Sequence, residues 1–132
     1  MAQAIVYSSF GDPDVLTLVD IPDPVAGPGE VVVRVEAVGV NPIDHKLRSG
    51  LRPSPAIEEP RRIGNDAAGI VTAVGEGVDG FRTGDPVVVF GATGTYATDL
   101  AVPVRSVQPR PASVTAAEGA ALGVPVGTAY QA

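Results

Sequence analysis

Valine occupies alternate positions in the segment from Glu30 to Val40, which reads EVVVRVEAVGV. Successive side chains of an extended chain point to opposite faces. Val31, Val33 and Val35 therefore share one face, and charged residues occupy the other. This pattern is typical of a β-strand with one buried side and one side facing water. It constrains the fold more strongly than any other part of the sequence.

Glycine and proline divide the rest of the chain into short pieces. The 16 glycines and 13 prolines among 132 residues favour short strands and tight turns over a helix bundle. The apolar patterns predict further strands at 3–7, 15–21, 69–74, 86–90, 95–103 and 104–108. Because a closed barrel leaves no strand edge exposed, we expect a mainly β fold, a closed or nearly closed barrel with a few short helices.

A short helix is predicted directly after the valine-rich strand. Asn41 can cap it, Pro42 suits its first position, and Asp44 favours the positive end of its dipole. Gly50 ends it. The segment 51–62 then predicts an irregular loop, whose last two arginines are expected to form exposed ion pairs with two neighbouring glutamates. The residues of these pairs are Arg61, Arg62, Glu58 and Glu59.

The C-terminal part of the chain predicts more helix. Residues 114–122 form the predicted segment, and either Ser113 or Thr115 can act as its N-cap. Residues 127–132 resemble the first turn of another helix. We expect the tail from 124 to 130 to present an apolar patch that forms contacts between copies.

The composition excludes several classes of function. Fifteen Asp and Glu against nine Lys and Arg give a net charge of −6, which opposes binding to nucleic acid or to an anionic membrane. The absence of cysteine and the single histidine argue against a zinc site and against thiol catalysis. With no leader-like N-terminus and no apolar run near the roughly 18 residues that span a bilayer, we expect a cytoplasmic protein.

Residues 75–80 read GEGVDG and match the dinucleotide-binding pattern G-x-G-x-x-G after a predicted strand. That pattern needs a helix opening at its last glycines, so that the helix N-terminus faces the pyrophosphate. Gly84 and Pro86 follow almost at once and would break such a helix. We therefore interpret these residues as a glycine-rich connection between strands.

Three segments, taken in order, resemble one protein family. They are GEVVVRVEAVGVNPIDHKLRSG (29–50), IGNDAAGIVTAVGEGVDGFRTGDPVV (63–88) and VPVGTAYQA (124–132). Together they resemble the N-terminal half of a medium-chain dehydrogenase/reductase of the zinc-independent, quinone oxidoreductase-like branch. The resemblance implies a GroES-like distorted β-barrel as the catalytic domain over 1–123. Residues 124–132 would then begin the linking helix toward a Rossmann domain that is missing from these residues.

The resemblance also implies a function. It is that of an NADPH-dependent oxidoreductase, with NADH as the alternative cofactor, that reduces quinones or α,β-unsaturated carbonyls (enones) by hydride transfer. Without zinc as a Lewis acid, the substrate must accept hydride readily, as conjugated carbonyls do. We expect the whole protein to be a homodimer, and these 132 residues alone to be inactive because the Rossmann domain holds most of the cofactor. The alternatives are a non-catalytic GroES-like interaction module and a ring-forming chaperonin-type barrel.

The same resemblance locates the candidate site residues. Metal ligands of zinc-dependent relatives match Asn41, Asn65 and Asp66, so no metal is expected, and Asn65 and Asp66 are expected to bond to each other. The candidate catalytic residues are Asn41, Asp44 and Lys46. The candidate cofactor-binding residues are Asn41, Pro42, Ile43, Asp44 and Thr128. The candidate substrate-binding residues are Arg52 and His45.

Each of these residues has a structural alternative. Asn41 can bind the cofactor or a substrate oxygen, and it can equally cap a helix together with Asp44. Lys46 can stabilise an anionic product, His45 can relay a proton, and Arg52 can orient a substrate oxygen. The alternative for these last three is a solvated side chain.

Overall fold

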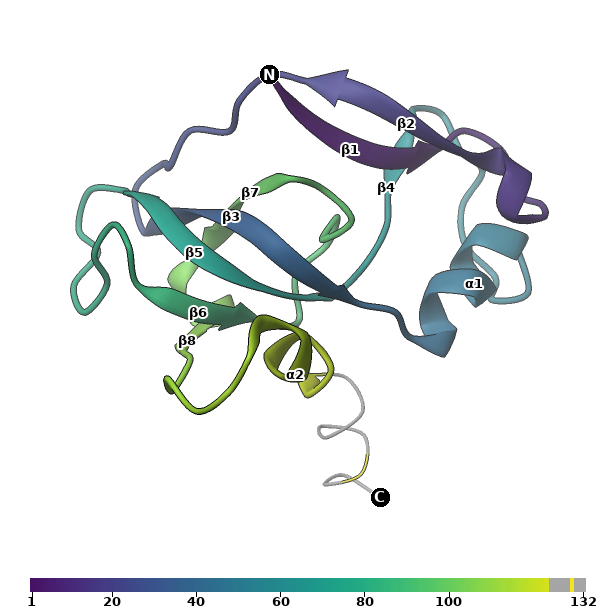
Figure 1. Ribbon diagram of the computed structural model, residues 1–132. Coiled ribbons are helices and arrows are strands. Elements are labelled where there is room, and N and C mark those ends of the chain that lie inside the picture. The colour runs from purple at the N-terminus through teal and green to yellow at the C-terminus, as the bar shows by residue number, and fades with distance from the viewer. Residues whose placement is uncertain (124–128, 130–132) are drawn as a thin grey trace.

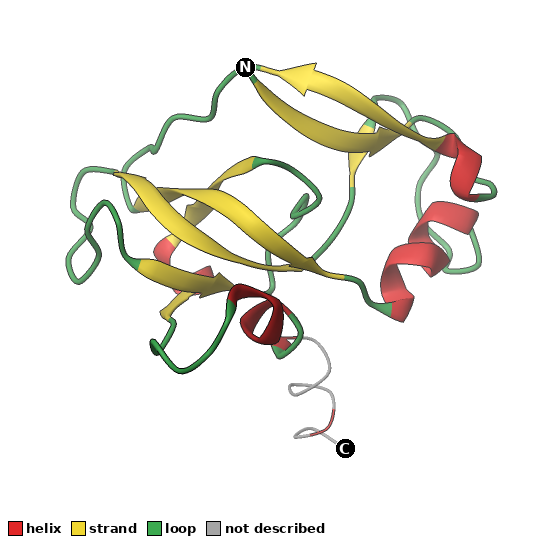
Figure 2. Ribbon diagram, viewed as in Figure 1, coloured by secondary structure: helices red, strands yellow, loops and turns green. Residues whose placement is uncertain are grey.

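The computed structural model describes residues 1–123 and 129, which form a mainly β fold (Figures 1 and 2). The strands are β1 (Ala2–Tyr7), β2 (Leu16–Ile21), β3 (Glu30–Gly39), β4 (Arg61–Arg62), β5 (Asp66–Val74), β6 (Pro86–Val89), β7 (Asp99–Pro103) and β8 (Val107–Pro109). The α-helices are α1 (Pro42–Ser49) and α2 (Ala116–Ala120), and the 3-10 helices are η1 (Pro13–Val15) and η2 (Val104–Ser106).

The strands pair in two antiparallel sheets, ordered β2-β1-β4 and β7-β3-β5-β6-β8. Figure 1 shows the smaller sheet lying across one end of the larger one. An isolated bridge between Ala4 and Ala97 joins the two sheets. The predicted mainly β fold is confirmed, but the described strands do not pair continuously around a closed ring. The reason is that the larger sheet ends in β7 on one side and β8 on the other, and these two strands pair neither with each other nor with the strands of the smaller sheet.

The core lies on the valine-rich face of β3. Val31 and Val33 have no exposed surface, as the alternation predicted. Val32, which lies between them in the strand, is buried too. The full core cluster is Val31, Val33, Ala67, Val71, Val87, Val89, Ala92, Leu100, Val102 and Val107. Burying a valine side chain stabilises a fold by about 1.5–3 kcal/mol, so this cluster is the main source of stability.

Several predicted elements differ from the observed ones in length. The strand expected over 95–103 begins only at Asp99, because Ala97 before it forms a bridge to Ala4 of β1. The strand expected over 104–108 begins with η2, where the Val107 N–H donates to the Val104 carbonyl. The loop expected over 51–62 ends in β4, which pairs with β1. The glycine-rich residues 75–80 connect β5 to β6 without a helix, as predicted.

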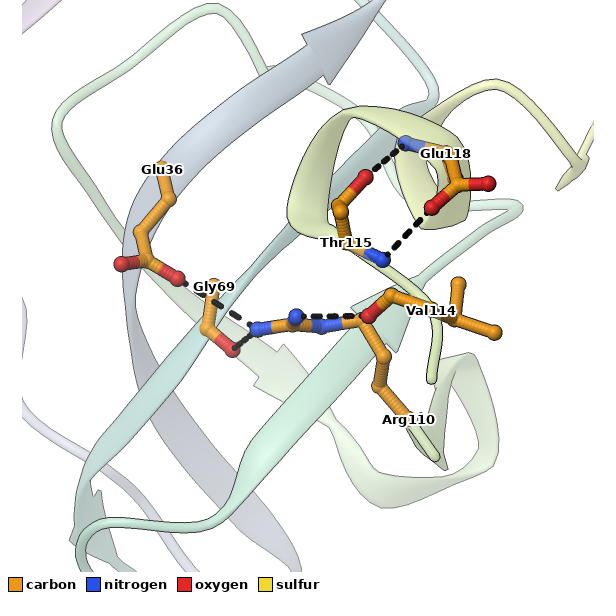
Figure 3. Close-up of polar contacts among 6 residues, drawn as sticks. All are labelled: Glu36, Gly69, Arg110, Val114, Thr115 and Glu118. Atoms are coloured by element: carbon orange, nitrogen blue, oxygen red, sulfur yellow. Dashed lines mark hydrogen bonds and ion pairs between the residues drawn. The ribbon is translucent and has the colours of Figure 1, made fainter. Parts of the chain in front are cut away.

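Arg110 holds α2 over the larger sheet (Figure 3). Its guanidinium donates to the Val114 carbonyl at 3.1 Å and to the Gly69 carbonyl of β5 at 3.5 Å. It also pairs with the Glu36 carboxylate of β3 at 3.4 Å. Only glycine fits at position 39 of β3, because a Cβ on Gly39 would collide with the Ala120 carbonyl of α2. The short helix therefore docks by close backbone approach and by one arginine whose side chain is only 10% exposed.

The predicted linking helix over 124–132, the predicted apolar patch over 124–130 and the candidate residue Thr128 lie outside the described residues, apart from residue 129. Within the described part of the chain, no helix has the length and apolar character needed to span a membrane.

Candidate functional site

The N-terminus of α1 is built from the residues that predicted it. Asn41 is the N-cap, with an extended backbone (φ −124°, ψ 154°), and Pro42 follows it. The Asn41 N–H donates to the Asp44 carboxylate at 2.9 Å, and the Asp44 N–H donates to the Asn41 carbonyl at 2.9 Å. Gly50 ends the helix with φ 85°. The predicted helix is therefore confirmed at both ends.

A buried hydrogen-bond network surrounds this helix start. The Tyr96 hydroxyl donates to Asp44 Oδ2 at 2.8 Å, and Asn41 Nδ2 donates to Asp66 Oδ2 at 2.9 Å. Asn41, Asp44 and Asp66 are only 5%, 3% and 1% exposed. Buried carboxylates are stable only when donors satisfy them, so these bonds fix the side chains in place.

The hydrogen-bond partner of Asp66 is not the residue that the sequence analysis expected. The predicted bond between Asn65 and Asp66 is replaced by the bond from Asn41 to Asp66. The reason is the sheet register, which pairs Asp66 of β5 with Gly39 at the end of β3, two residues before Asn41.

Tyr96 is the member of this hydrogen-bond network that the sequence analysis did not single out. It lies between β6 and β7, in the segment 95–103 that was predicted to be a strand. Nothing in that pattern distinguished Tyr96 from its neighbours. Burial, followed by its hydrogen bond to Asp44 and the charge of that carboxylate, raises the pKa of Tyr96 well above its ordinary value. Gly64, with φ 102°, leaves room for its ring, because a Cβ there would collide with Thr95 and Tyr96. The phenol is therefore held in its protonated, hydrogen-bond-donating form.

An open cavity of about 450 Å³ lies beside α1. Four candidate residues line it: Asn41, Pro42, Asp44 and His45. Five further residues line it that the sequence did not single out: Leu16, Val40, Arg48, Ile63 and Tyr96. Polar groups from the helix start thus face aliphatic walls from β2, the end of β3 and the segment before β5.

The other candidates lie elsewhere. Lys46 and Arg52 are exposed and outside the lining of this cavity, and the Arg52 N–H donates to the Lys46 carbonyl at 3.1 Å. Ile43 is half-buried on α1 and is also outside the lining. The exposed ion pairs predicted for Arg61 and Arg62 do not form.

Those two arginines bind backbone and hydroxyl oxygens instead. Arg61 donates to Ser54 Oγ at 3.2 Å and to the Pro55 carbonyl at 2.6 Å. Arg62 donates to the Gly94 carbonyl at 3.1 Å, and burial lowers the pKa of Arg62. The prediction was wrong because loop carbonyls, which sequence patterns do not locate, lie closer to both guanidinium groups than the glutamates.

The donor set at the cavity fits one end of a nicotinamide cofactor. The Asn41 amide can bond to a carboxamide, and the walls formed by Val40 and Ile63 suit the face of a ring. Among the described residues, no three His, Cys, Asp or Glu side chains come together as a metal site would require.

Comparison with known proteins assigns the family. The family model of the alcohol dehydrogenase GroES-like domain matches residues 27–112. The quinone oxidoreductase of Lama guanicoe is 39% identical over 134 residues, which cover 100% of this chain and 40% of that protein. The chloroplastic quinone-oxidoreductase homolog of Spinacia oleracea is 40% identical and is covered over 42% of its length. The chain thus spans well under half the length of the curated relatives that it matches.

Solved structures agree with this assignment. Pseudomonas syringae quinone oxidoreductase matches with a TM-score of 0.82 and 38% identity over 94% of this chain and 38% of that one. Escherichia coli quinone oxidoreductase complexed with NADPH matches with a TM-score of 0.86 and 32% identity over 97% and 39%. Human synaptic vesicle membrane protein VAT-1 homolog-like protein matches with a TM-score of 0.91 and 33% identity over 98% and 41%. The chain therefore belongs to the alcohol dehydrogenase GroES-like domain family, and its predicted resemblance to quinone oxidoreductases is confirmed.

Proposed function

We propose that this chain forms the catalytic domain, over residues 1–123, of an NADPH-dependent reductase of quinones or α,β-unsaturated carbonyls. The observation that carries the proposal is the buried cluster of Asn41, Asp44 and Tyr96 beside an open cavity, in a chain whose relatives are named quinone oxidoreductases. One such relative was solved with NADPH. A linking helix from residue 124, a homodimer and a cytoplasmic location belong to the same proposal.

Asn41 is the proposed orienting group. NADPH, when bound, supplies the hydride that no side chain can supply. An amide nitrogen carries two hydrogens, and Asn41 Nδ2 uses one of them for Asp66. The second hydrogen is available to a carbonyl oxygen of the cofactor or of the substrate. Because Asp66 fixes the amide in advance, little ordering is left to occur during the reaction.

Asp44 and Tyr96 support that amide. Asp44 accepts from the backbone of Asn41 and from the Tyr96 hydroxyl, so the helix start cannot shift without breaking both bonds. His45 lines the same cavity and belongs to the class of side chain that carries protons near neutral pH. We propose that it supplies the proton that follows hydride onto the acceptor. The exposed Lys46, next to His45 on α1, and the exposed Arg52, whose backbone binds Lys46, are proposed to stabilise and orient the acceptor's oxygen.

The proposal is tested on the protein encoded by the complete reading frame. NADPH consumption is measured with a naphthoquinone and with an enone. We expect turnover that falls roughly 100-fold or more in Asn41→Ala, as for other lost oxyanion-binding or orienting donors. Gln108→Ala removes an exposed amide away from the cavity and is the matched control. A folded protein that binds NADPH but reduces neither acceptor contradicts the proposal.

A non-catalytic interaction module is the second candidate. It is favoured by the likeness to the human VAT-1 homolog-like protein, which is named a synaptic vesicle membrane protein and not a reductase. The same assay separates the two, because a module would show no NADPH consumption with either acceptor.

A further inference from the structure

An apolar groove extends from the candidate site along the gap between the two sheets. It consists of the cavity beside α1 and a second open cavity of about 270 Å³. Tyr96 lines both of them. Leu16 and Val40 line the cavity beside α1, and Leu18 and Val38 line the second one.

Strand geometry explains why these four side chains form two facing rows. Leu16 and Leu18 are two residues apart on β2, so they point to the same side and lie about 7 Å apart. At the end of β3, the pairing with β5 shifts register between Val35 and Ala37. Val38 then pairs with Ala67 of the core, so it shares the inner face of the sheet and turns toward the gap.

The groove leaves a large amount of apolar side chain in contact with water. Leu18 is 59% exposed, Val38 38% and Val40 75%. Exposed apolar rows of this kind are unfavourable unless a ligand or partner covers them. The bridge between Ala4 and Ala97 holds the two sheets at a set spacing, so the groove cannot close by collapse.

The second cavity has no charged side chain in its lining. Its residues are Gln3, Ala4, Ile5, Leu18, Val38, Tyr96, Ala97 and Thr98. An anionic or cationic ligand would find no partner there, whereas a neutral aliphatic chain would bury apolar surface on both sides. Tyr96 lines both this cavity and the cavity beside α1, and its hydroxyl donates to Asp44 at the helix start, so the two cavities are neighbours.

We infer that the groove binds the aliphatic tail of the substrate, whose carbonyl head lies at Asn41. The substrate class is then an alkyl- or prenyl-substituted quinone, or a long-chain enone. This inference rests on the proposed function for the nature of the head group, while the tail site rests on the groove itself.

The test uses saturated methyl ketones of increasing chain length, without added NADPH, so that binding is measured and no reduction can occur. Dissociation constants are measured by calorimetry on the 132-residue chain. We expect affinity to rise about two- to fourfold with each added methylene, since burial of one methylene is worth up to about a fourfold change. Affinity that does not change with chain length would overturn the inference.

Two variants locate the tail. Leu18→Asn should remove the dependence on chain length and leave the shortest ketone unaffected. Val25→Asn is the matched control, because Val25 is 82% exposed and lies outside both cavities. Leu18→Trp introduces the only tryptophan of the chain, and its emission should shift to shorter wavelength as long ketones bind. Equal weakening by Leu18→Asn and Val25→Asn would contradict the groove as the binding site.

The outcomes separate this inference from the proposed function. Chain-length-dependent ketone binding without enone or quinone reduction would support the groove and reject the reductase. Reduction of short and long acceptors with equal kcat/KM would support the reductase and reject the tail site.

Discussion

At the scale of single residues, Tyr96 connects the candidate site to the rest of the protein. It donates to Asp44 across 52 positions of sequence, and it lines both parts of the groove. Its raised pKa has a direct consequence for stability. A group whose pKa is higher in the folded than in the unfolded state stabilises the fold below the unfolded pKa and loses that contribution as pH rises through the folded value.

Tyr96→Phe tests this directly. Below pH about 10, the ordinary tyrosine pKa, we expect the variant to lose about 1–2 kcal/mol of unfolding free energy, because a hydrogen bond to a carboxylate is removed. Above that pH the parent protein should lose stability and the difference should shrink. Urea unfolding across the alkaline range measures both. Tyr7→Phe removes a hydroxyl outside the Asp44 cluster and is the control. Its stability difference from the parent protein should not shrink in the same way as pH rises.

At the scale of elements, α2 shows how one side chain selects a helix start. Sequence left Ser113 and Thr115 as alternative N-caps, and the structure has Thr115 in that role. Thr115 Oγ1 accepts from the Glu118 N–H at 3.1 Å, and Glu118 Oε1 accepts from the Thr115 N–H at 3.0 Å (Figure 3). These two reciprocal hydrogen bonds between Thr115 and Glu118 form a capping box. A helix of five residues depends on such a cap and on its packing against the sheet.

We predict that Thr115→Ala lowers the free energy of unfolding by about 1 kcal/mol. Ser113→Ala, the matched control, should change it by less than about 0.5 kcal/mol. Denaturant unfolding at neutral pH measures both variants. Equal losses would mean that α2 is not capped by Thr115.

Glu118, the acidic residue of the same capping box, adds an expectation about pH. Hydrogen bonding from Thr115 lowers the pKa of Glu118. The contribution of Glu118 is therefore present above the unfolded pKa and lost as pH falls through the folded value. The stability difference between the parent protein and Glu118→Gln should shrink on acidification.

At the scale of the whole molecule, Arg110 joins parts of the chain that are distant in sequence. It binds Gly69 of β5, Glu36 of β3 and the segment that leads into α2. Its side chain is 10% exposed, whereas that of Glu36 is 42% exposed. The carbonyl bonds should thus outweigh the ion pair, since an exposed pair is worth at most about 1 kcal/mol.

Arg110→Met keeps the aliphatic stem and removes all these bonds. We expect it to lower the free energy of unfolding by about 1–3 kcal/mol, because two carbonyls lose a charged donor. Glu36→Gln should cost less than about 1 kcal/mol. Thermal and urea unfolding compare the two. A larger loss in Glu36→Gln than in Arg110→Met would show that the ion pair, and not the carbonyl bonds, holds α2.

The sequence by itself determined the elements whose causes are local. Alternating valines specify β3, the Asn41-Pro42 start and Gly50 specify α1, and Gly84 with Pro86 exclude a helix after the glycine-rich turn. Each of these signals acts between neighbours within one strand face or one helical turn. The three family segments were recognisable for the same reason, since they are contiguous stretches of chain.

Only the tertiary structure decided which residues meet. Asp66 binds Asn41 rather than Asn65, and Tyr96 reaches Asp44, because the register of β3 on β5 and the bridge to β1 bring them together. The register shift between Val35 and Ala37 of β3 also turns Val38 toward the groove. A one-residue change of register reverses the face of every later side chain, and no local pattern fixes where such a shift occurs.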